Sequence, residues 1–313
     1  MHASVTASGE MIEWLGELQA LESVGGKAAS LDRLARAGFR IPPGFCVTTG
    51  GFRAHLDAVA AASAVRDALA ALPDEAARTT VADAVRSAPL PAALASALDG
   101  ATSRLGGDAA RASQFAVRSS AIGEDGRAAS FAGLHDTELG VAPGAVGDAV
   151  RRCWSSLWSR EAIAYRERRG VSLAGAAMAV VVQALVPADA AAVVFTRHPV
   201  TGSDQEVVVT AVRGLGEPMV SGTTTPDTIV VDRASGAVID FSPGDGGERL
   251  IATDAGVAYR PGAAGVPALA DVERAELVHL ALEVERAFGD AVDIEAALAN
   301  GRWYLLQARP ITA

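Results

Sequence analysis

The spacing of apolar residues makes the first half of the chain mainly helical. Residues 27–37 carry apolar side chains at helical intervals, and Gly38 is placed to end that helix. Three alanine-rich stretches with a helical period then reach about residue 106, and helices are expected again over residues 145–169. Short apolar runs between these stretches predict strands at residues 11–15, 45–47 and 115–118.

The second half of the chain is predicted to be rich in strands. One long amphipathic helix, residues 271–288, interrupts them. Helices and strands mix without a regular alternation, so an α+β architecture is favoured over a doubly wound parallel sheet. The strands are expected at residues 178–183, 191–196, 206–212, 228–231, 292–298 and 303–307.

Changes of pattern predict three lobes. Residues 1–106 would form an N-terminal lobe with a helical segment, because the sequence pattern changes after Gly106-Gly107 from helical spacing to a strand and a polar loop. Residues 107–190 would form a central lobe with a long polar loop, and residues 191–313 a C-terminal lobe that ends in a hairpin. A chain of 313 residues is long enough to bury a sizeable core in such an arrangement.

Composition and charge narrow the classes of protein. With 50% hydrophobic and 20% charged residues, the chain resembles globular proteins rather than disordered or fibrous ones. Its net charge of −10 argues against non-specific nucleic-acid binding, which needs an excess of basic side chains. Cys46 and Cys153 lie in apolar surroundings and are expected to be buried thiols. No leader peptide and no apolar stretch of membrane-spanning length is found, so a cytoplasmic protein without membrane contact is expected.

The turn Val24-Gly25-Gly26-Lys27 before a helix is a candidate phosphate-binding site. Glycines allow backbone N–H groups to approach an anion closely, and the N-terminus of a helix favours negative charge. The alternative interpretation is a glycine turn followed by a solvated lysine.

Arg118 stands at the end of an apolar strand, where its guanidinium could bind phosphate oxygens in a bidentate manner. The polar loop that follows, residues 119–133, ends in Ser130-Phe131-Ala132-Gly133. A loop of this composition could close over a polyphosphate and exclude water. A solvated surface loop is the alternative.

The C-terminal strands carry a carboxylate, Glu295, and an amide, Gln307, whose faces depend on the register of the hairpin. If Asn300-Gly301 form a two-residue turn, Glu295 opposes Leu306, so Glu295 and Gln307 point to opposite faces. Such a register would prevent the two side chains from sharing a metal ion.

A three-residue loop, Ala299-Asn300-Gly301, would give the other register. Glu295 would then oppose Leu305, and it would share a face with Gln307 and Arg309, with the two potential ligands placed diagonally. Carboxylate and amide oxygens suit Mg²⁺, which takes one or two protein ligands and otherwise binds substrate phosphates. The alternative is a set of ordinary exposed polar residues on a hairpin.

Several segments, in this order along the chain, resemble the ATP-binding domain of the family that includes pyruvate phosphate dikinase, phosphoenolpyruvate synthase and rifampin phosphotransferase. The resemblance covers nearly the whole chain, and in extent it is nearest to the nucleotide domain of the rifampin enzymes. The segments are Val24-Gly25-Gly26-Lys27, Ile41-Pro42-Pro43-Gly44, Val117-Arg118-Ser119-Ser120, Ser130-Phe131-Ala132-Gly133, Phe195-Thr196-Arg197-His198-Pro199-Val200-Thr201-Gly202, Gly214-Leu215-Gly216-Glu217, Pro226-Asp227, Asp293-Ile294-Glu295 and Leu306-Gln307-Ala308-Arg309-Pro310.

The resemblance implies an ATP-grasp fold in which a nucleotide is held between lobes, with ATP and Mg²⁺ as cofactors. It also implies a role for each matching side chain. The catalytic residues would be Lys27, Arg118 and Arg309, which would hold phosphates. The lid would contribute Gly133 and Thr137, Gln183 would lie on the adenine side, and Glu295 and Gln307 would bind the metal.

The family's reaction passes a phosphoryl group from ATP to a histidine, with AMP and phosphate as products. None of the chain's histidines lies in the glycine-rich, threonine-containing context of the family's phosphohistidine; they are His2, His55, His135, His198 and His279. The expected partner is therefore a protein or domain that carries an acceptor histidine and a substrate-binding domain. The final acceptor would be a small molecule such as an antibiotic or pyruvate.

Two other functions fit the same residues. An ATP-grasp ligase would activate a carboxylate as an acylphosphate and release ADP. A nucleotide-binding scaffold would have kept the fold and lost turnover, although Lys27, Arg118, Glu295, Gln307 and Arg309 are all present.

Overall fold

The computed structural model describes residues 10–107, 113–121, 137–169, 176–263 and 265–311. The described part of the chain packs into two compact units. Unit 1 takes residues from Met1–Ala29 and Pro43–Ala184, and unit 2 takes those from Ser30–Pro42 and Leu185–Ala313. The division into three lobes, expected from the sequence, stays a prediction.

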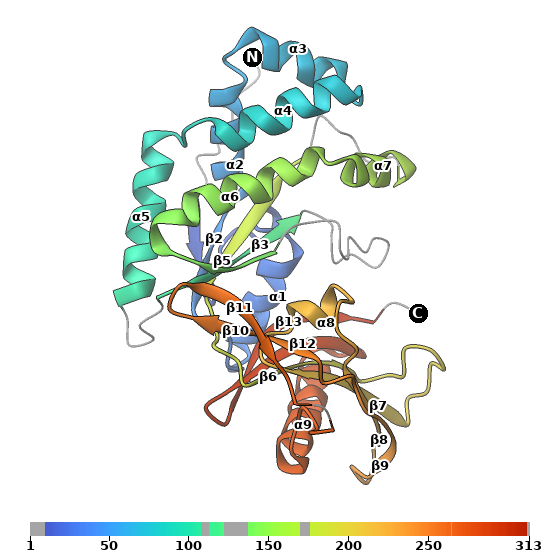
Figure 1. Cartoon of the computed structure of the whole chain (residues 1–313). Coiled ribbons are helices and arrows are strands. Elements are labelled where there is room, and N and C mark those ends of the chain that lie inside the picture. The colour runs from blue at the N-terminus through green and yellow to red at the C-terminus, as the bar shows by residue number, and fades with distance from the viewer. Residues whose placement is uncertain (1–9, 108–112, 122–136, 170–175, 264, 312–313) are drawn as a thin grey trace. The chain divides into compact units, whose positions relative to one another are not determined.

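Unit 1 is built on a five-stranded sheet with the strand order β1-β2-β5-β3-β4 (Figure 1). Every neighbouring pair in it is antiparallel. The central strands β3 and β5 are buried along their whole length, as expected for apolar runs inside a sheet. The bounds are β1 Ile12–Trp14, β2 Gly44–Val47, β3 Phe115–Ala121, β4 Thr137–Val141 and β5 Met178–Ala184.

Helices cover one face of this sheet. Phe45, Val117 and Val182 lie on that face and belong to one core with Phe52 and Trp154 from the helices. Figure 1 shows α4 and α6 running across the sheet in this layer. The helices are α2 Thr49–Val59, α3 Ser63–Ala71, α4 Glu75–Ser87, α5 Ala92–Gly107, α6 Val146–Ser155 and α7 Arg160–Arg169, with short 3₁₀ turns at Pro143–Ala145 and Ser156–Trp158.

The opposite face of the same sheet carries polar residues among small apolar ones, and we call it the polar face. Residues at alternate positions of β3, namely Ala116, Arg118 and Ser120, lie on it because Val117 and Ser119 point to the helix side. The first turn of α1 (Gly25–Arg36), which follows a 3₁₀ turn at Leu21–Ser23, packs on this polar face through Ser120. The fold thus separates an apolar, helix-covered face from a polar face that carries predicted site residues.

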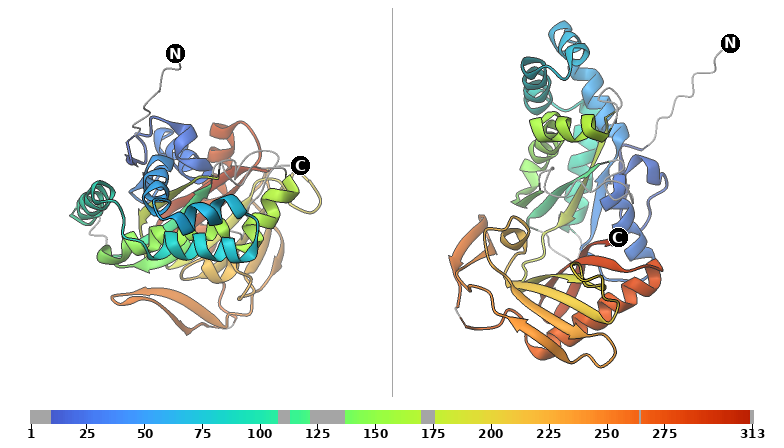
Figure 2. Two further views of the ribbon diagram at one scale, coloured as in Figure 1. Left: turned by 90° about the horizontal axis from the view of Figure 1, so that it is seen from above. Right: turned by 90° about the vertical axis from the view of Figure 1, so that its right-hand side faces the viewer.

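Unit 2 contains a six-stranded antiparallel sheet with the order β13-β12-β6-β7-β8-β9. One face packs on α9, and the shared core includes Val194, Val209, Ile294 and Leu277. The second view of Figure 2 shows α9 lying along this sheet. The bounds are β6 Ala190–Phe195, β7 Glu206–Arg213, β8 Asp227–Asp232, β9 Val238–Ser242, α9 Asp271–Phe288, β12 Val292–Ala299 and β13 Arg302–Pro310; a separate hairpin joins β10 Glu248–Thr253 to β11 Gly256–Pro261, and α8 spans Glu217–Val220.

Mixed helices and antiparallel sheets confirm the α+β prediction. The helix expected over residues 271–288 is present with the same bounds as α9, and every predicted strand is found within a few residues. The region expected to hold three helices before residue 106 holds four, because α3 and α4 are separate short helices. In the described residues no helix is long and apolar enough to cross a membrane.

Candidate functional site

Lys27 lies in the first turn of α1, as expected. The turn that precedes it depends on glycine, since Gly25 has a φ of +71° and a Cβ there would meet the carbonyl oxygen of Ser120 at 2.1 Å. Val24 and Ala28, on either side of the turn, are fully buried, whereas Lys27 itself is half-buried. The sequence therefore fixes the backbone of the turn against β3 and leaves the lysine at the polar face of unit 1.

Arg118, Thr137 and Gln183 share that polar face. Thr137 on β4 lies directly opposite Arg118. Gln183 on β5 lies opposite Ala116, two residues from Arg118 on the same side of β3. Arg118 is only 9% exposed and Gln183 only 2%. Unit 1 thus gathers a buried cation, a buried amide and a hydroxyl on one face, together with the turn that carries Lys27.

The predicted lid is only partly covered by the structure. Gly133 and most of the loop that ends with it lie outside the described residues. Ser119 and Ser120, expected to open this loop, instead belong to β3, which runs to Ala121. The strand is longer because both serines are buried and pair with Val180 and Ala179 of β5.

The β12–β13 hairpin adopts neither register considered from the sequence. Asn300 and Gly301 form a two-residue turn in which both residues have positive φ, +51° and +66°. A β-bulge next to Ala296 then shifts the pairing by one residue, because Leu305 pairs with Ala296 and Gln307 with Glu295. Glu295 therefore lies directly opposite Gln307, and the expected diagonal placement was wrong.

The bulge restores the shared face that a regular two-residue hairpin would lose. Glu295, Gln307 and Arg309 all lie on the face of the sheet that points away from α9, because Ile294 and Ala308 point into the α9 core. The carboxylate and the amide come from paired positions, so their oxygens start from adjacent backbone sites. This donor set fits Mg²⁺, which accepts one or two protein oxygens.

Arg309 is held by a partner that the sequence did not reveal. Asp293 lies directly opposite it, and the Arg309 Nε atom donates to both carboxylate oxygens of Asp293 at 2.9 and 2.6 Å. The Asp-Ile-Glu motif contains this aspartate, but only the register of the hairpin shows what it contacts. Asp293 orients the guanidinium on the same face as Glu295 and Gln307.

The His198 segment forms a hydrogen-bonded turn after β6. The Nδ1 atom of His198 accepts hydrogen bonds from the backbone N–H groups of Val200 and Thr201, both at 3.2 Å. Arg197 forms an ion pair with Asp204 at 2.6 Å. His198 thus shapes its own turn, and the expectation that it is no phosphoryl acceptor stays a prediction.

The expected burial of the cysteines is confirmed, since Cys46 and Cys153 are free thiols in the core. Burial raises the pKa of the Cys46 thiol well above its ordinary value, with a smaller contribution from the charge of Glu13. The thiol is therefore kept protonated beside the Lys27 turn, where its Sγ atom contacts the carbonyl of Val24.

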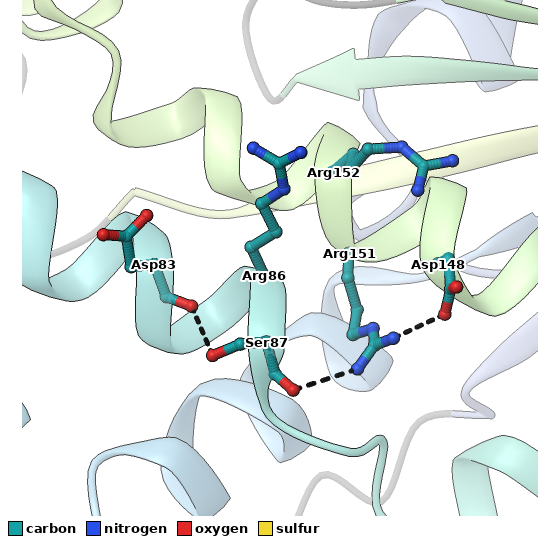
Figure 3. Close-up of a pocket in the computed structure, with 6 residues that line it drawn as sticks. All are labelled: Asp83, Arg86, Ser87, Asp148, Arg151 and Arg152. Atoms are coloured by element: carbon teal, nitrogen blue, oxygen red, sulfur yellow. Dashed lines mark hydrogen bonds and ion pairs between the residues drawn. The ribbon is translucent and has the colours of Figure 1, made fainter.

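A pocket of about 440 Å³ lies between α4 and α6, on the helix side of unit 1 (Figure 3). Its lining residues are Asp83, Arg86, Ser87, Asp148, Arg151 and Arg152. Arg151 is bound by Asp148 and by the carbonyl of Ala88, and Arg152 is bound by Glu138. Figure 3 shows the three guanidinium groups pointing in different directions. None of the predicted site residues lines this pocket.

One property of the sequence singles out Lys27 without any structure. It is the only lysine in the chain, and all other basic residues apart from histidine are arginines. Arginine can replace lysine as a solvated charge on most surfaces, whereas a compact ammonium in a glycine turn is not replaceable in this way. The role of Lys27 stays a prediction, and its being the sole lysine makes it chemically addressable by amine-reactive reagents.

Comparison with known proteins gives a consistent result. Residues 21–313 match the family described as pyruvate phosphate dikinase, AMP/ATP-binding domain. A rifampicin phosphotransferase of Streptomyces sviceus is 38% identical, with 92% of this chain and 34% of that protein covered. The prodigiosin synthesizing transferase PigC of Serratia marcescens is 37% identical (92% and 31% covered), and a probable phosphoenolpyruvate synthase of Methanocaldococcus jannaschii is 35% identical (97% and 27% covered).

The chain spans about a third of the length of these relatives. The match to the family runs from the 3₁₀ turn before Lys27 to the end of the chain, and it includes both groups of residues described above. The chain belongs to the family of AMP/ATP-binding domains of pyruvate phosphate dikinase.

Proposed function

We propose that this domain has the ATP-grasp fold and binds Mg·ATP. Lys27 and Arg118 of unit 1 and Arg309 of unit 2 would bind phosphate oxygens. Gln183 would contact the adenine, Thr137 would contact the phosphates from β4, and Gly133 would do so from the loop after β3. Glu295 and Gln307 would hold Mg²⁺.

The pairing of Glu295 with Gln307, beside the Arg309–Asp293 ion pair, is the observation that carries this proposal. Two side chains with oxygen donors and an oriented guanidinium lie on one face of one sheet, which supports the proposal. A polyphosphate with its metal needs such a combination of negative, neutral and positive groups. Mg²⁺, when bound, would neutralise charge on the phosphate oxygens.

The residues of the chain would act mainly by position and charge. Phosphoryl transfer develops charge on the transferred group, and preorganised cations stabilise that charge. Arg118 is 9% exposed, so its interaction with a phosphate would be little weakened by solvent. Asp293 would hold Arg309 in place through the ion pair.

We further propose that the phosphoryl group passes to a histidine on a separate domain or protein, and from there to a small-molecule acceptor, with AMP and phosphate as the nucleotide products. The similarity to a rifampicin phosphotransferase and to a probable phosphoenolpyruvate synthase supports a phosphotransfer function. Their greater length leaves room for the further domains that this route requires. An acylphosphate-forming ligase would release ADP instead, so the product identifies the reaction.

The sole lysine gives a direct test of the binding site. Acetylation by an amine-reactive ester can modify only Lys27 and the α-amino group of the chain. Mg·ATP is expected to slow the modification of Lys27 severalfold and to leave the α-amino group unchanged as an internal control. Equal modification of Lys27 with and without saturating Mg·ATP would count against the proposal.

A further inference from the structure

The turn Val24–Ala28, which carries Lys27 and is called the Lys27 turn, is joined to the sheet by hydrogen bonds to one buried hydroxyl. The Oγ atom of Ser120 donates to the carbonyl of Val24 at 2.8 Å and accepts from the N–H of Ala28 at 3.1 Å. Ser120, Val24 and Ala28 are each fully buried. The hydroxyl therefore spans the turn from the residue before Gly25 to the residue after Lys27.

This bridge joins two groups that are four residues apart. A carbonyl and an N–H at that spacing are the partners of the first hydrogen bond of a helix, so the Ser120 hydroxyl adds a second link across the first turn of α1. The bridge is neutral and lies away from water, where hydrogen bonds hold geometry most firmly. Gly25 completes the fit, because any Cβ there would collide with the Ser120 carbonyl at 2.1 Å.

The position of Ser120 on its strand links the turn to Arg118. The two residues are two apart on β3 and lie on the same polar face. The hydrogen bonds that hold the turn on Ser120 therefore also fix the distance between the Lys27 backbone and the Arg118 backbone. Ser119, between them, is equally buried but points to the helix side of the sheet.

We propose that Ser120 is a positioning residue that sets where Lys27 stands relative to Arg118. The inference rests on the proposed function for its consequence, namely the binding of phosphates by both cations, but the bridge itself does not depend on it. Without the Ser120 hydroxyl, the turn loses the two side-chain hydrogen bonds that join it to β3. The Lys27 ammonium would then sample more positions. Phosphate binding would weaken, because binding would have to order the ammonium at a cost in free energy.

The test compares Ser120→Ala with Ser119→Ala, the same substitution at a neighbouring buried serine on the other face. Two quantities are measured for each purified protein: the rate of Lys27 acetylation without nucleotide, relative to the α-amino group, and the dissociation constant of Mg·ATP. Ser120→Ala is expected to give a rate of Lys27 acetylation that differs from that of the wild type. It is also expected to raise the dissociation constant of Mg·ATP about threefold to tenfold, which corresponds to the loss of one net hydrogen bond. Ser119→Ala is expected to match the wild type in both.

The outcomes separate this inference from the proposed function. Wild-type values of both quantities in Ser120→Ala overturn the positioning role. If Ser120→Ala changes the rate of Lys27 acetylation, but neither the wild type nor the variants bind Mg·ATP, the bridge is supported and the proposed function is excluded.

Amide hydrogen exchange on the unaltered protein gives a test that does not depend on the folding of a variant. The Ala28 amide is expected to exchange as slowly as the amides of β3, although it makes the first hydrogen bond of its helix and helix ends commonly open and exchange fast. Fast exchange of Ala28 would overturn the inference.

Discussion

At the scale of single residues, the proposed site depends on a few side chains whose contacts only the structure shows. Arg309 is bound by Asp293 across the hairpin, and Glu295 stands opposite Gln307. Gln307 is 5% exposed, which is unusual for a glutamine outside a hydrogen-bonded or ligand-binding role. Each of these residues should therefore respond to substitution more strongly than a surface residue of the same type.

Replacement of Gln307 by alanine is expected to weaken Mg·ATP binding about tenfold, because one of two protein oxygens for the metal is lost. Gln205→Ala serves as the matched control, since Gln205 is exposed in the turn before β7. Titration of Mg·ATP into both variants measures the effect. If the two variants bind alike, Gln307 is no metal ligand.

His55 should make the stability of the protein depend on pH. It is fully buried on Trp154, with its Nε2 atom 2.8 Å from the carbonyl of Val85. Burial lowers the pKa of His55 below its ordinary value, and the charge of Arg151 lowers it further, against the opposing effect of the Val85 carbonyl. The unfolded chain then binds a proton more readily than the folded protein, so acid favours unfolding.

The free energy of unfolding is accordingly expected to fall as the pH drops through the unfolded-state pKa of about 6.5, by at most about 1.4 kcal/mol per pH unit for this group. Urea unfolding at about pH 7.5 and about pH 5.5 measures the change. His55→Gln removes the titrating group and should show a smaller difference between the two conditions. An equal difference in both proteins would assign the pH dependence to other groups.

At the scale of elements, the hairpin β12–β13 shows where sequence analysis succeeded and where it failed. Both strands were placed correctly, and Glu295, Gln307 and Arg309 share a face as one of the two considered registers required; their roles stay predictions. The register was wrong because the sequence signals the Asn-Gly turn but not the bulge beside Leu306. A bulge changes side-chain alternation by one residue at small cost, so residue types alone leave it undetermined.

Other features that the sequence analysis did not predict were missed for related reasons. Strands β9 and β11 carry mixed and largely exposed residues, so no apolar alternation marks them. Asp293 was seen only as part of a motif, since its contact with Arg309 exists only across strands. The core strands and α9 were predictable because burial on one or both faces leaves a strong apolar pattern.

The turn of this hairpin makes a prediction about stability. Gly301 has a φ of +66° with open space around it, so Gly301→Ala should lower the free energy of unfolding by about 1 kcal/mol through backbone strain alone. Gly100, exposed within α5 and also in open space, offers the matched control. Gly100→Ala should raise that free energy by about 0.5–1 kcal/mol, because alanine favours a helix. Chemical denaturation measures both, and shifts of the same sign would contradict the argument.

At the scale of the whole molecule, each of the two units presents one sheet face that carries predicted nucleotide-binding residues. Unit 1 supplies Lys27, Arg118 and Gln183, and unit 2 supplies Glu295, Gln307 and Arg309. The proposed function requires both sets to act on one Mg·ATP. Loss of a single residue from either unit should therefore weaken binding of the same ligand.

Titration calorimetry of Mg·ATP into the wild type, Lys27→Ala and Glu295→Ala tests this claim most directly. We expect micromolar-range binding that requires Mg²⁺ in the wild type, and a loss of about tenfold or more in each variant, since one substitution removes a cation and the other a metal ligand. Wild-type affinity in either variant, or no binding of Mg·ATP by the wild type, would contradict the account.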